Sequence, residues 1–194
     1  IEACLVGSEM CIRDSFSRRA MIHRMNGDLA NDLGNLSQRV LSMIFKNCSG
    51  VMPALPATAA PEDSALLDAA DAMLGKVRAH MDVQSFHEAL RCIWEVVSDA
   101  NKYVDTTAPW GLKKIDPVRM GEVLAVLAET IRQAAILVQP VMPGSASKIL
   151  DQLGVADGQR GFDMLAGAGR IAAGVEISKP EPVFPRFVEE EGEV

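Results

Sequence analysis

The sequence has few aromatic side chains and no long apolar run, and both absences narrow the possible folds. Aromatic residues make up 5% of the chain, and Ala, Leu, Val and Met dominate an apolar fraction of 48%. This balance favours helices packed on helices over a β-sandwich. Because spanning a bilayer takes roughly 20 consecutive apolar residues, and because the N-terminus lacks the regions of a signal peptide, we expect a cytoplasmic protein without membrane contact.

Patterns for metal binding and for disulfide frameworks are also missing. The four cysteines, Cys4, Cys11, Cys48 and Cys92, form no CxxC pair and have no histidine at ligand spacing. We therefore expect reduced thiols and no metal site. The three histidines have no neighbouring nucleophile, a pattern typical of surface positions rather than of catalysis.

Motifs of nucleotide-binding and hydrolytic enzymes are absent as well. There is no P-loop and no GxSxG motif in the sequence. The Gly167-Ala-Gly169 run lacks the strand and helix that a dinucleotide-binding loop requires. We therefore expect no catalytic residue and no cofactor in this chain.

Acidic residues outnumber basic ones, which gives a formal net charge of −7. Sequence-blind binding to nucleic acid needs a basic surface that displaces counterions, so this charge argues against it. Recognition of a few unstacked bases stays compatible with it, because stacking and hydrogen bonds carry that discrimination. The charge is also uneven, since basic residues prevail between positions 18 and 46 and glutamates crowd the last positions.

Apolar periodicity predicts a bundle of helices. The first helix is expected from residue 16 to the Cys-Ser-Gly stop at 48–50. Its buried stripe is expected to consist of Leu29, Leu33, Leu36, Val40 and Ile44. Further helices are expected over residues 61–81, from 85 to the proline at 109, and over 117–138 and 145–153. The 117–138 helix is apolar nearly all round and is expected to be the central one.

Local signals mark the ends of these helices. Ser85 and Glu88 have the spacing of a capping box. The core stripe of the helix that follows is expected to be Phe86, Leu90, Ile93, Val97 and Val104. Asp116 before Pro117 is the pattern of an N-cap with a first-turn proline, and Gly154 is the expected C-cap of the last helix.

The chain divides into three segments on these grounds. Residues 1–15 show no convincing helical or strand periodicity. We interpret them as a linker or a foreign segment and assign no function to them. Residues 16–154 are expected to form an all-α antiparallel helical bundle. Residues 155–194 contain glycines, three spaced prolines and an acidic end, which predicts an irregular C-terminal strap and tail.

The first helix carries a polar strip opposite its leucine stripe. Asn31, Asn35 and Arg39 recur every four residues, and Gln38 lies on the same side. Asparagine is a mediocre helix former, so propensity does not explain this strip. Paired amide donors and acceptors with one guanidinium fork suit the Watson–Crick edges of unstacked bases. The alternative is an ordinary solvated face.

A second candidate feature is the Ala108-Pro109-Trp110-Gly111 run, for which we predict a fixed turn. A tryptophan just past a helix end, beside a stiffening proline, can serve as a stacking platform for a base. The alternative is a tryptophan folded back onto the bundle. Trp94, within a predicted helix, is expected to be partly core.

Several segments occur in an order typical of one family. They are Arg24-Met-Asn26-Gly-Asp28-Leu-Ala-Asn31-Asp-Leu-Gly-Asn35-Leu, Asn101-Lys-Tyr103-Val-Asp105 leading into Pro109-Trp110, Gln139-Pro140-Val-Met-Pro143, and Pro182-Val-Phe184-Pro185-Arg186. Together they resemble the anticodon-binding domain of methionyl-tRNA synthetase, over residues 16–187 of the chain.

The resemblance implies a helical domain that recognises the CAU anticodon for a class I synthetase, which charges tRNA with methionine. It implies that Trp110 stacks on the first anticodon base, held by Pro109. It also implies that Asn31, Asn35 and Arg39 hydrogen-bond the anticodon bases. The family motif positions that we interpret as structural are Asn26, Asp28, Asn101 and Tyr103.

The same resemblance implies partners and cofactors outside the chain. The HIGH and KMSKS types of signature that bind ATP are absent, so ATP and Mg are assigned to the catalytic domain of the parent enzyme. The expected partners are that catalytic domain and the anticodon loop of tRNA(Met). No appended dimerisation module follows Arg186, which favours a monomer.

Two alternatives stay open. The first is a helical protein-interaction module, which the acidic composition favours and which a buried Trp110 would support. The second is the anticodon-binding domain of another class I synthetase, such as the leucine or valine enzyme. The Asn-Asp-Leu-Gly-Asn run followed by Pro-Trp argues against this second alternative.

Overall fold

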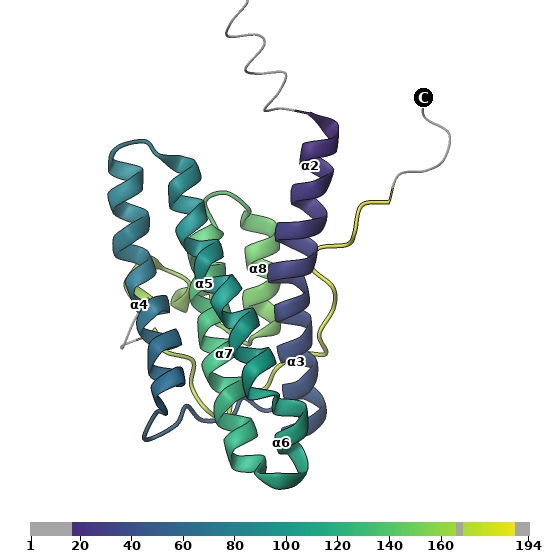
Figure 1. Ribbon diagram of the computed structural model, residues 1–194. Helices are drawn as coiled ribbons and strands as arrows, with labels where there is room; N and C mark the ends of the chain where they lie inside the picture. Colours follow the sequence, from purple (N-terminus) through teal and green to yellow (C-terminus); the bar gives the residue numbers. More distant parts are fainter. Residues whose placement is uncertain (1–16, 166–168, 189–194) are drawn as a thin grey trace, which may run out of the picture.

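The structure, a computed structural model, describes residues 17–165 and 169–188, and the regular elements among them are all helices (Figure 1). In chain order they are α2 (Arg18–Arg24), η1 (Met25–Gly34), α3 (Asn35–Asn47), α4 (Pro61–Asp82), α5 (Phe86–Thr107), α6 (Pro109–Ile115), α7 (Pro117–Val138), α8 (Pro143–Gln152), η2 (Asp157–Gln159) and η3 (Phe162–Met164). The predicted all-α antiparallel bundle is confirmed. Residues 1–15, with Cys4 and Cys11, lie outside the described residues.

α2, η1 and α3 follow one another as a single rod, with Ser17 capping its start through a 3.1 Å bond from the Ala20 amide. The middle segment, η1, is a π-helix, in which backbone bonds span five residues instead of four. The predicted stripe is buried at Leu33, Leu36, Val40 and Ile44 and half-buried at Leu29. This rod therefore packs one apolar face on the bundle, as periodicity predicted.

Gly34, where η1 passes into α3, explains why the sequence has a glycine inside a helix. A Cβ at this position would lie 2.8 Å from the Leu29 carbonyl oxygen and 3.4 Å from the Phe184 side chain. The backbone of the π-helical segment itself therefore excludes a side chain at this position, and the Phe184 side chain of the strap packs against the glycine at contact distance.

α7 is the central helix (Figure 1), and residues 123–138 are buried without exception. Its buried residues include the charged Glu129 and Arg132. Glu129 accepts two hydrogen bonds from Arg132, at 2.9 and 2.8 Å. Pairing of this kind keeps buried charges satisfied. Asp116 caps α7 by accepting from the Arg119 amide at 2.9 Å, as predicted.

Three local predictions were wrong in detail. The Ser85 side chain makes no capping bond, because the amides of Glu88 and Ala89 bond to its backbone oxygen instead. Phe86, predicted to be core, is exposed, since it stands at the α4–α5 turn at the end of the hairpin. The predicted turn at residues 108–111 is the beginning of a short helix, α6.

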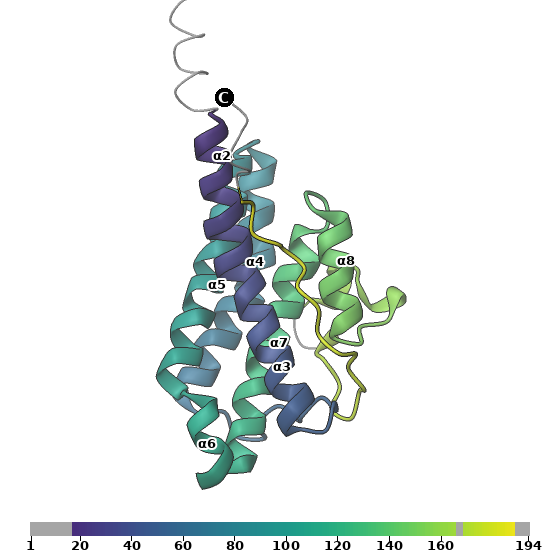
Figure 2. The same ribbon diagram turned by 90° about the vertical axis from the view of Figure 1, so that its right-hand side faces the viewer.

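The C-terminal strap runs along the rod of α2, η1 and α3 (Figure 2). It begins after α8, whose C-cap is Leu153. Gly154, the predicted C-cap, is the residue that follows, and it takes the left-handed φ of +72° that this position favours. Val51 and Glu176 form an isolated β-bridge. Further along, the Asn26 side chain holds both backbone groups of Phe187, at 2.8 and 3.0 Å. Among the helices of the described residues, none has the length and apolarity of a membrane span.

Candidate nucleic-acid interface

The predicted polar strip lines a shallow pocket between the rod and α5. This pocket, called here the polar pocket, has a volume of about 450 Å³. It is lined by Asn31, Asn35, Gln38, Arg39, Ser42, Asn101 and Asp105. The structure therefore brings Asn31, Asn35 and Arg39 together on one surface, as their four-residue spacing predicted.

The Arg39 guanidinium is the centre of this pocket. Its Nη1 donates to Asp105 Oδ1 at 2.9 Å, and its Nη2 donates to Asn101 Oδ1 at 3.3 Å. Both partners come from α5, so Arg39 is oriented across the pocket from the opposite wall. The Arg39 and Asp105 side chains keep 34% and 65% of their surface exposed, and an exposed ion pair of this kind opens at little cost.

Two polar atoms of the pocket have no partner. Among the described residues, Gln38 Oε1 and Arg39 Nε are the buried side-chain atoms that make no hydrogen bond. A buried polar group without a partner costs free energy, typically about 1–3 kcal/mol. One of these atoms is an acceptor and the other a donor, and both are covered, so a base edge reaches them only when the side chains around them move.

The strap contributes a second guanidinium beside the strip. Arg186 Nη2 donates to Asn31 Oδ1 at 2.6 Å, and Gln38 Nε2 donates to the Pro180 oxygen at 3.4 Å. Asn35, by contrast, is exposed. Sequence reasoning missed Asn101, Asp105 and Arg186 as neighbours of the strip, because 62 to 155 positions separate them from their partners.

Trp110 lies on α6, where Pro109 is buried and the Trp110 side chain is 54% exposed. It does not line the polar pocket. Figures 1 and 2 place α6 at the same end of the bundle as the last turns of α3. An exposed indole anchored by a buried proline is the arrangement that suits base stacking, whereas a tryptophan folded onto the bundle would be covered.

The motif residues interpreted as structural do tie segments together. Trp94 donates its indole N–H to the Asp28 carbonyl oxygen at 3.0 Å, which links α5 to η1. Asn101 donates to the Asp32 and Val97 carbonyl oxygens, at 3.4 and 3.1 Å. These contacts fix the two helices that form the walls of the polar pocket.

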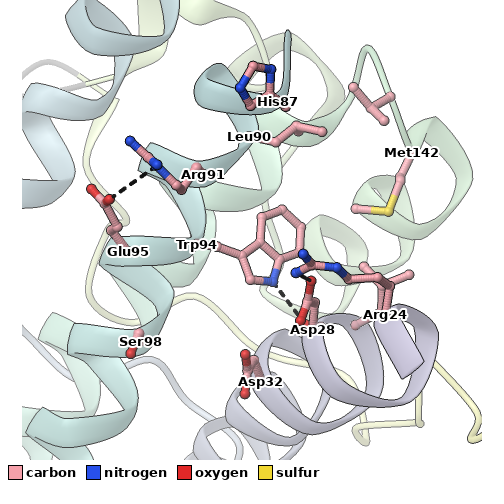
Figure 3. A pocket seen from close by; sticks show the side chains of 12 residues that line it. Arg24, Asp28, Asp32, His87, Leu90, Arg91, Trp94, Glu95, Ser98 and Met142 are labelled. Carbon is pink, nitrogen blue, oxygen red and sulfur yellow. Dashed lines mark hydrogen bonds and ion pairs between the residues drawn. The ribbon is translucent and has the colours of Figure 1, made fainter. Parts of the chain in front are cut away.

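A larger cavity of about 720 Å³ lies further along the same two helices (Figure 3). Its wall is apolar at Leu90, Trp94 and Met142, and charged residues of both signs line the rest of it. Burial and the neighbouring Asp28 raise the pKa of Asp32. Because none of the predicted site residues lines this cavity, the polar pocket is the candidate interface. No cluster of potential metal ligands occurs among the residues that the structure describes.

Comparisons with known proteins point to one family. Residues 53–194 match the family described as "Anticodon binding domain of methionyl tRNA ligase". A methionine–tRNA ligase of Brucella suis biovar 1 (strain 1330) is 51% identical over 176 residues, which is 90% of this chain and 34% of that protein. A methionine–tRNA ligase of Mycobacterium tuberculosis (strain ATCC 25618 / H37Rv) is 48% identical over 89% of this chain and 34% of its own length.

Solved structures agree with the sequence relatives. The crystal structure of the free state of the Mycobacterium tuberculosis methionyl-tRNA synthetase matches with a TM-score of 0.85 at 45% identity. The match covers 90% of this chain and 36% of that one. The chain therefore spans about a third of the length of the curated relatives that it matches.

Proposed function

Since the chain belongs to the family of anticodon-binding domains of methionyl-tRNA ligase, we propose that it recognises the CAU anticodon of tRNA(Met). The recognition serves an enzyme that attaches methionine to this tRNA in the cytoplasm. ATP and Mg act in the catalytic domain of that enzyme, and this domain is the second partner of the chain. Residues 16–154 form the recognition bundle, and the strap after residue 154 braces it.

The observation that supports the proposal is the polar pocket, which brings Asn31, Asn35 and Arg39 to one surface. Gln38 Oε1 and Arg39 Nε are buried without partners, and both belong to the pocket that contains Asn31 and Asn35. An unstacked base presents both donors and acceptors along its edge. Anticodon bases form hydrogen bonds to the accessible amide and guanidinium groups of this pocket, and a wrong base leaves some of these groups unpaired, so the pocket discriminates.

Trp110 supplies the second element of the proposal. Its indole is exposed, and the buried Pro109 before it fixes the start of α6. Stacking on an aromatic side chain is tolerant of sequence, so Trp110 contributes affinity while the polar pocket contributes choice. Asn31, Asn35 and Arg39 form the hydrogen bonds to the bases.

The negative charge of the chain limits its affinity for the anticodon loop. With a formal net charge of −7, attraction to the phosphate backbone contributes little. Recognition by a few bases then gives modest affinity, which the intact enzyme raises by holding the tRNA at a second, linked contact. The proposal therefore predicts weak but base-specific binding by this chain alone.

Quenching of tryptophan fluorescence by a short anticodon stem-loop tests the proposal. We compare a CAU loop with a one-base variant at one moderate salt concentration, in the chain and in Trp110→Ala. Trp94, which bonds to Asp28, provides the unquenched background. Quenching that prefers CAU and disappears in Trp110→Ala supports the proposal. Absence of CAU preference, also with the catalytic domain attached, refutes it.

A further inference from the structure

Three helices of the bundle meet at one fully buried carboxylate. Asp63, in the first turn of α4, has no exposed side-chain surface. It accepts a bond from the Tyr103 hydroxyl of α5 at 2.6 Å and two bonds from the Arg119 guanidinium of α7, at 2.6 and 2.7 Å. Burial alone raises the pKa of Asp63, but the bonds from Arg119 and Tyr103 outweigh it and hold the pKa below its ordinary value.

The two partners of Asp63 stand on either side of α6. Tyr103 lies in the last turns of α5, before α6, and Arg119 lies in the first turn of α7, after it. The Thr107 hydroxyl donates to the Tyr103 carbonyl oxygen at 2.7 Å, which connects Tyr103 to the last residue of α5. Asp116 accepts from the Arg119 amide and carries the link to the end of α6. Both ends of α6 are therefore fastened to the same carboxylate.

Apart from these links, α6 is held by Pro109, by Leu112 and by its packing on α7. Its first residue, Pro109, is buried and Leu112 is half-buried, but its other side chains are exposed. The residue before it, Ala108, has a φ of +43°, which is unusual for a residue with a Cβ. A strained junction of this kind persists only where its surroundings fix it. The direction of Trp110 therefore depends on how firmly the two ends of α6 are held.

We propose that Asp63 is a positioning residue for anticodon recognition, which holds α6 through Tyr103 and Arg119 and so fixes the direction of Trp110. The inference rests on the proposed function. Asp63 touches no RNA on this view, and it acts on binding by keeping the indole in the orientation that a base can stack on. Loss of the link lowers the population of that orientation, and the apparent dissociation constant rises in proportion.

The first experiment examines Trp110 without RNA. The indole N–H signals of Trp94 and Trp110 are recorded by NMR and are assigned with Trp110→Phe. We expect Asp63→Asn and Tyr103→Phe to shift or broaden the Trp110 signal and to leave the Trp94 signal unchanged. Tyr103→Phe removes one hydrogen bond and keeps the Asp63–Arg119 pair, so it remains informative if Asp63→Asn does not fold.

A matched control separates positioning from general destabilisation. Glu129 is also a fully buried carboxylate with two bonds from an arginine, but its partner Arg132 lies within α7. We expect Glu129→Gln to lower the melting temperature and to leave the Trp110 signal in place. An unchanged Trp110 signal in both Asp63→Asn and Tyr103→Phe, or an equal change in Glu129→Gln, overturns the inference.

The second experiment measures binding of the CAU stem-loop. If the competent orientation falls to about a tenth of its population, the dissociation constant of Asp63→Asn rises about tenfold. In a Trp110→Ala background the same substitution has no further effect. Weaker binding by Trp110→Ala with unchanged binding by Asp63→Asn overturns this inference alone. Unchanged binding by Trp110→Ala overturns the proposed role of Trp110.

Discussion

Two aspartate–arginine pairs lie near the end of α5, and they differ in almost every respect. Asp63 and Arg119 are joined by two short bonds, and the carboxylate is fully buried. Asp105 and Arg39 share one bond of 2.9 Å, and both side chains are accessible. The same two residue types therefore hold the fold at one place and stay available to a ligand at the other.

The difference lies in what surrounds each pair. The buried pair adds the Tyr103 hydroxyl and the Ala60 amide as further donors to Asp63. The exposed pair leaves Arg39 Nε without a partner. A polar network in which every donor and acceptor is hydrogen-bonded is rigid, whereas a network with an unbonded group can still form a hydrogen bond to a ligand. Stability and recognition are thus separated by burial rather than by residue type.

The largest effect is expected from removing the buried carboxylate. Asp63→Ala leaves the Tyr103 hydroxyl without its acceptor and removes the two short bonds of Arg119, which keeps only the longer contacts to Glu122 and Glu62. The free energy of unfolding should therefore fall by about 3 kcal/mol. Asp105→Ala, in the exposed pair, should cost only about 0–1 kcal/mol. Urea denaturation of both variants measures the contrast. Equal losses would remove the distinction between the two pairs.

The two tryptophans should separate in the same way. Trp110→Ala is expected to weaken binding of a CAU stem-loop by about 1–3 kcal/mol, the size of one base–aromatic stack. Because Trp110 is exposed, its removal should change the free energy of unfolding by less than about 0.5 kcal/mol. Trp94→Ala loses the bond to Asp28 and should instead lower stability. Isothermal titration and urea denaturation together test both statements.

Arg39 should affect the choice of base as well as affinity. Arg39→Ala removes the guanidinium fork, and we expect a loss of about 1–3 kcal/mol for the CAU loop and a smaller loss for a changed anticodon. Arg39→Lys should not restore the preference, because an ammonium cannot present two parallel donors. Filter binding with both loops measures it. A uniform loss for all loops would make Arg39 a contact to the RNA backbone.

The smallest effect concerns acid. The pKa of Asp63 is lower in the folded chain than its ordinary value, so its ionisation stabilises the fold above about pH 4. That contribution is lost as the pH falls through the lower folded pKa. Asp63→Asn should therefore lose less stability between about pH 5 and pH 2 than the parent chain. Thermal unfolding across this range measures how stability depends on pH. The same dependence in both proteins would contradict the role assigned to Asp63.

Local sequence patterns were sufficient for the long helices and for the strip. Leu33, Leu36, Val40 and Ile44 are buried as periodicity predicted, because a helix has one repeat and one face toward the core. The same repeat places Asn31, Asn35 and Arg39 on a common surface. Asp116 caps α7, since capping depends on residues within one turn.

What sequence could not provide are contacts between distant segments. Tyr103 lies 40 positions from Asp63, and nothing near Asp63 marks it as more than a first-turn acidic residue. Phe86 fits the apolar stripe of its helix, but periodicity does not show that this residue lies at the exposed end of the α4–α5 hairpin. The short helix α6 begins after Ala108 with a φ of +43°, a backbone conformation that the Pro109-Trp110 pair does not predict.

The π-helical segment of the rod can absorb a change of length. A wide turn accommodates one residue more than an α-helical turn does, so it behaves like a single-residue insertion that the chain has kept. Loss of one residue within Met25–Gly34 is absorbed when a wide turn closes into an α-helical one, which keeps the direction of α2 relative to α3. Loss of one residue within the α-helical α3 would instead turn everything upstream by about 100°. Asn26 would then face away from Phe187, and the strap would lose its anchor. Homologous chains should therefore tolerate a change of length within Met25–Gly34 better than one within α3.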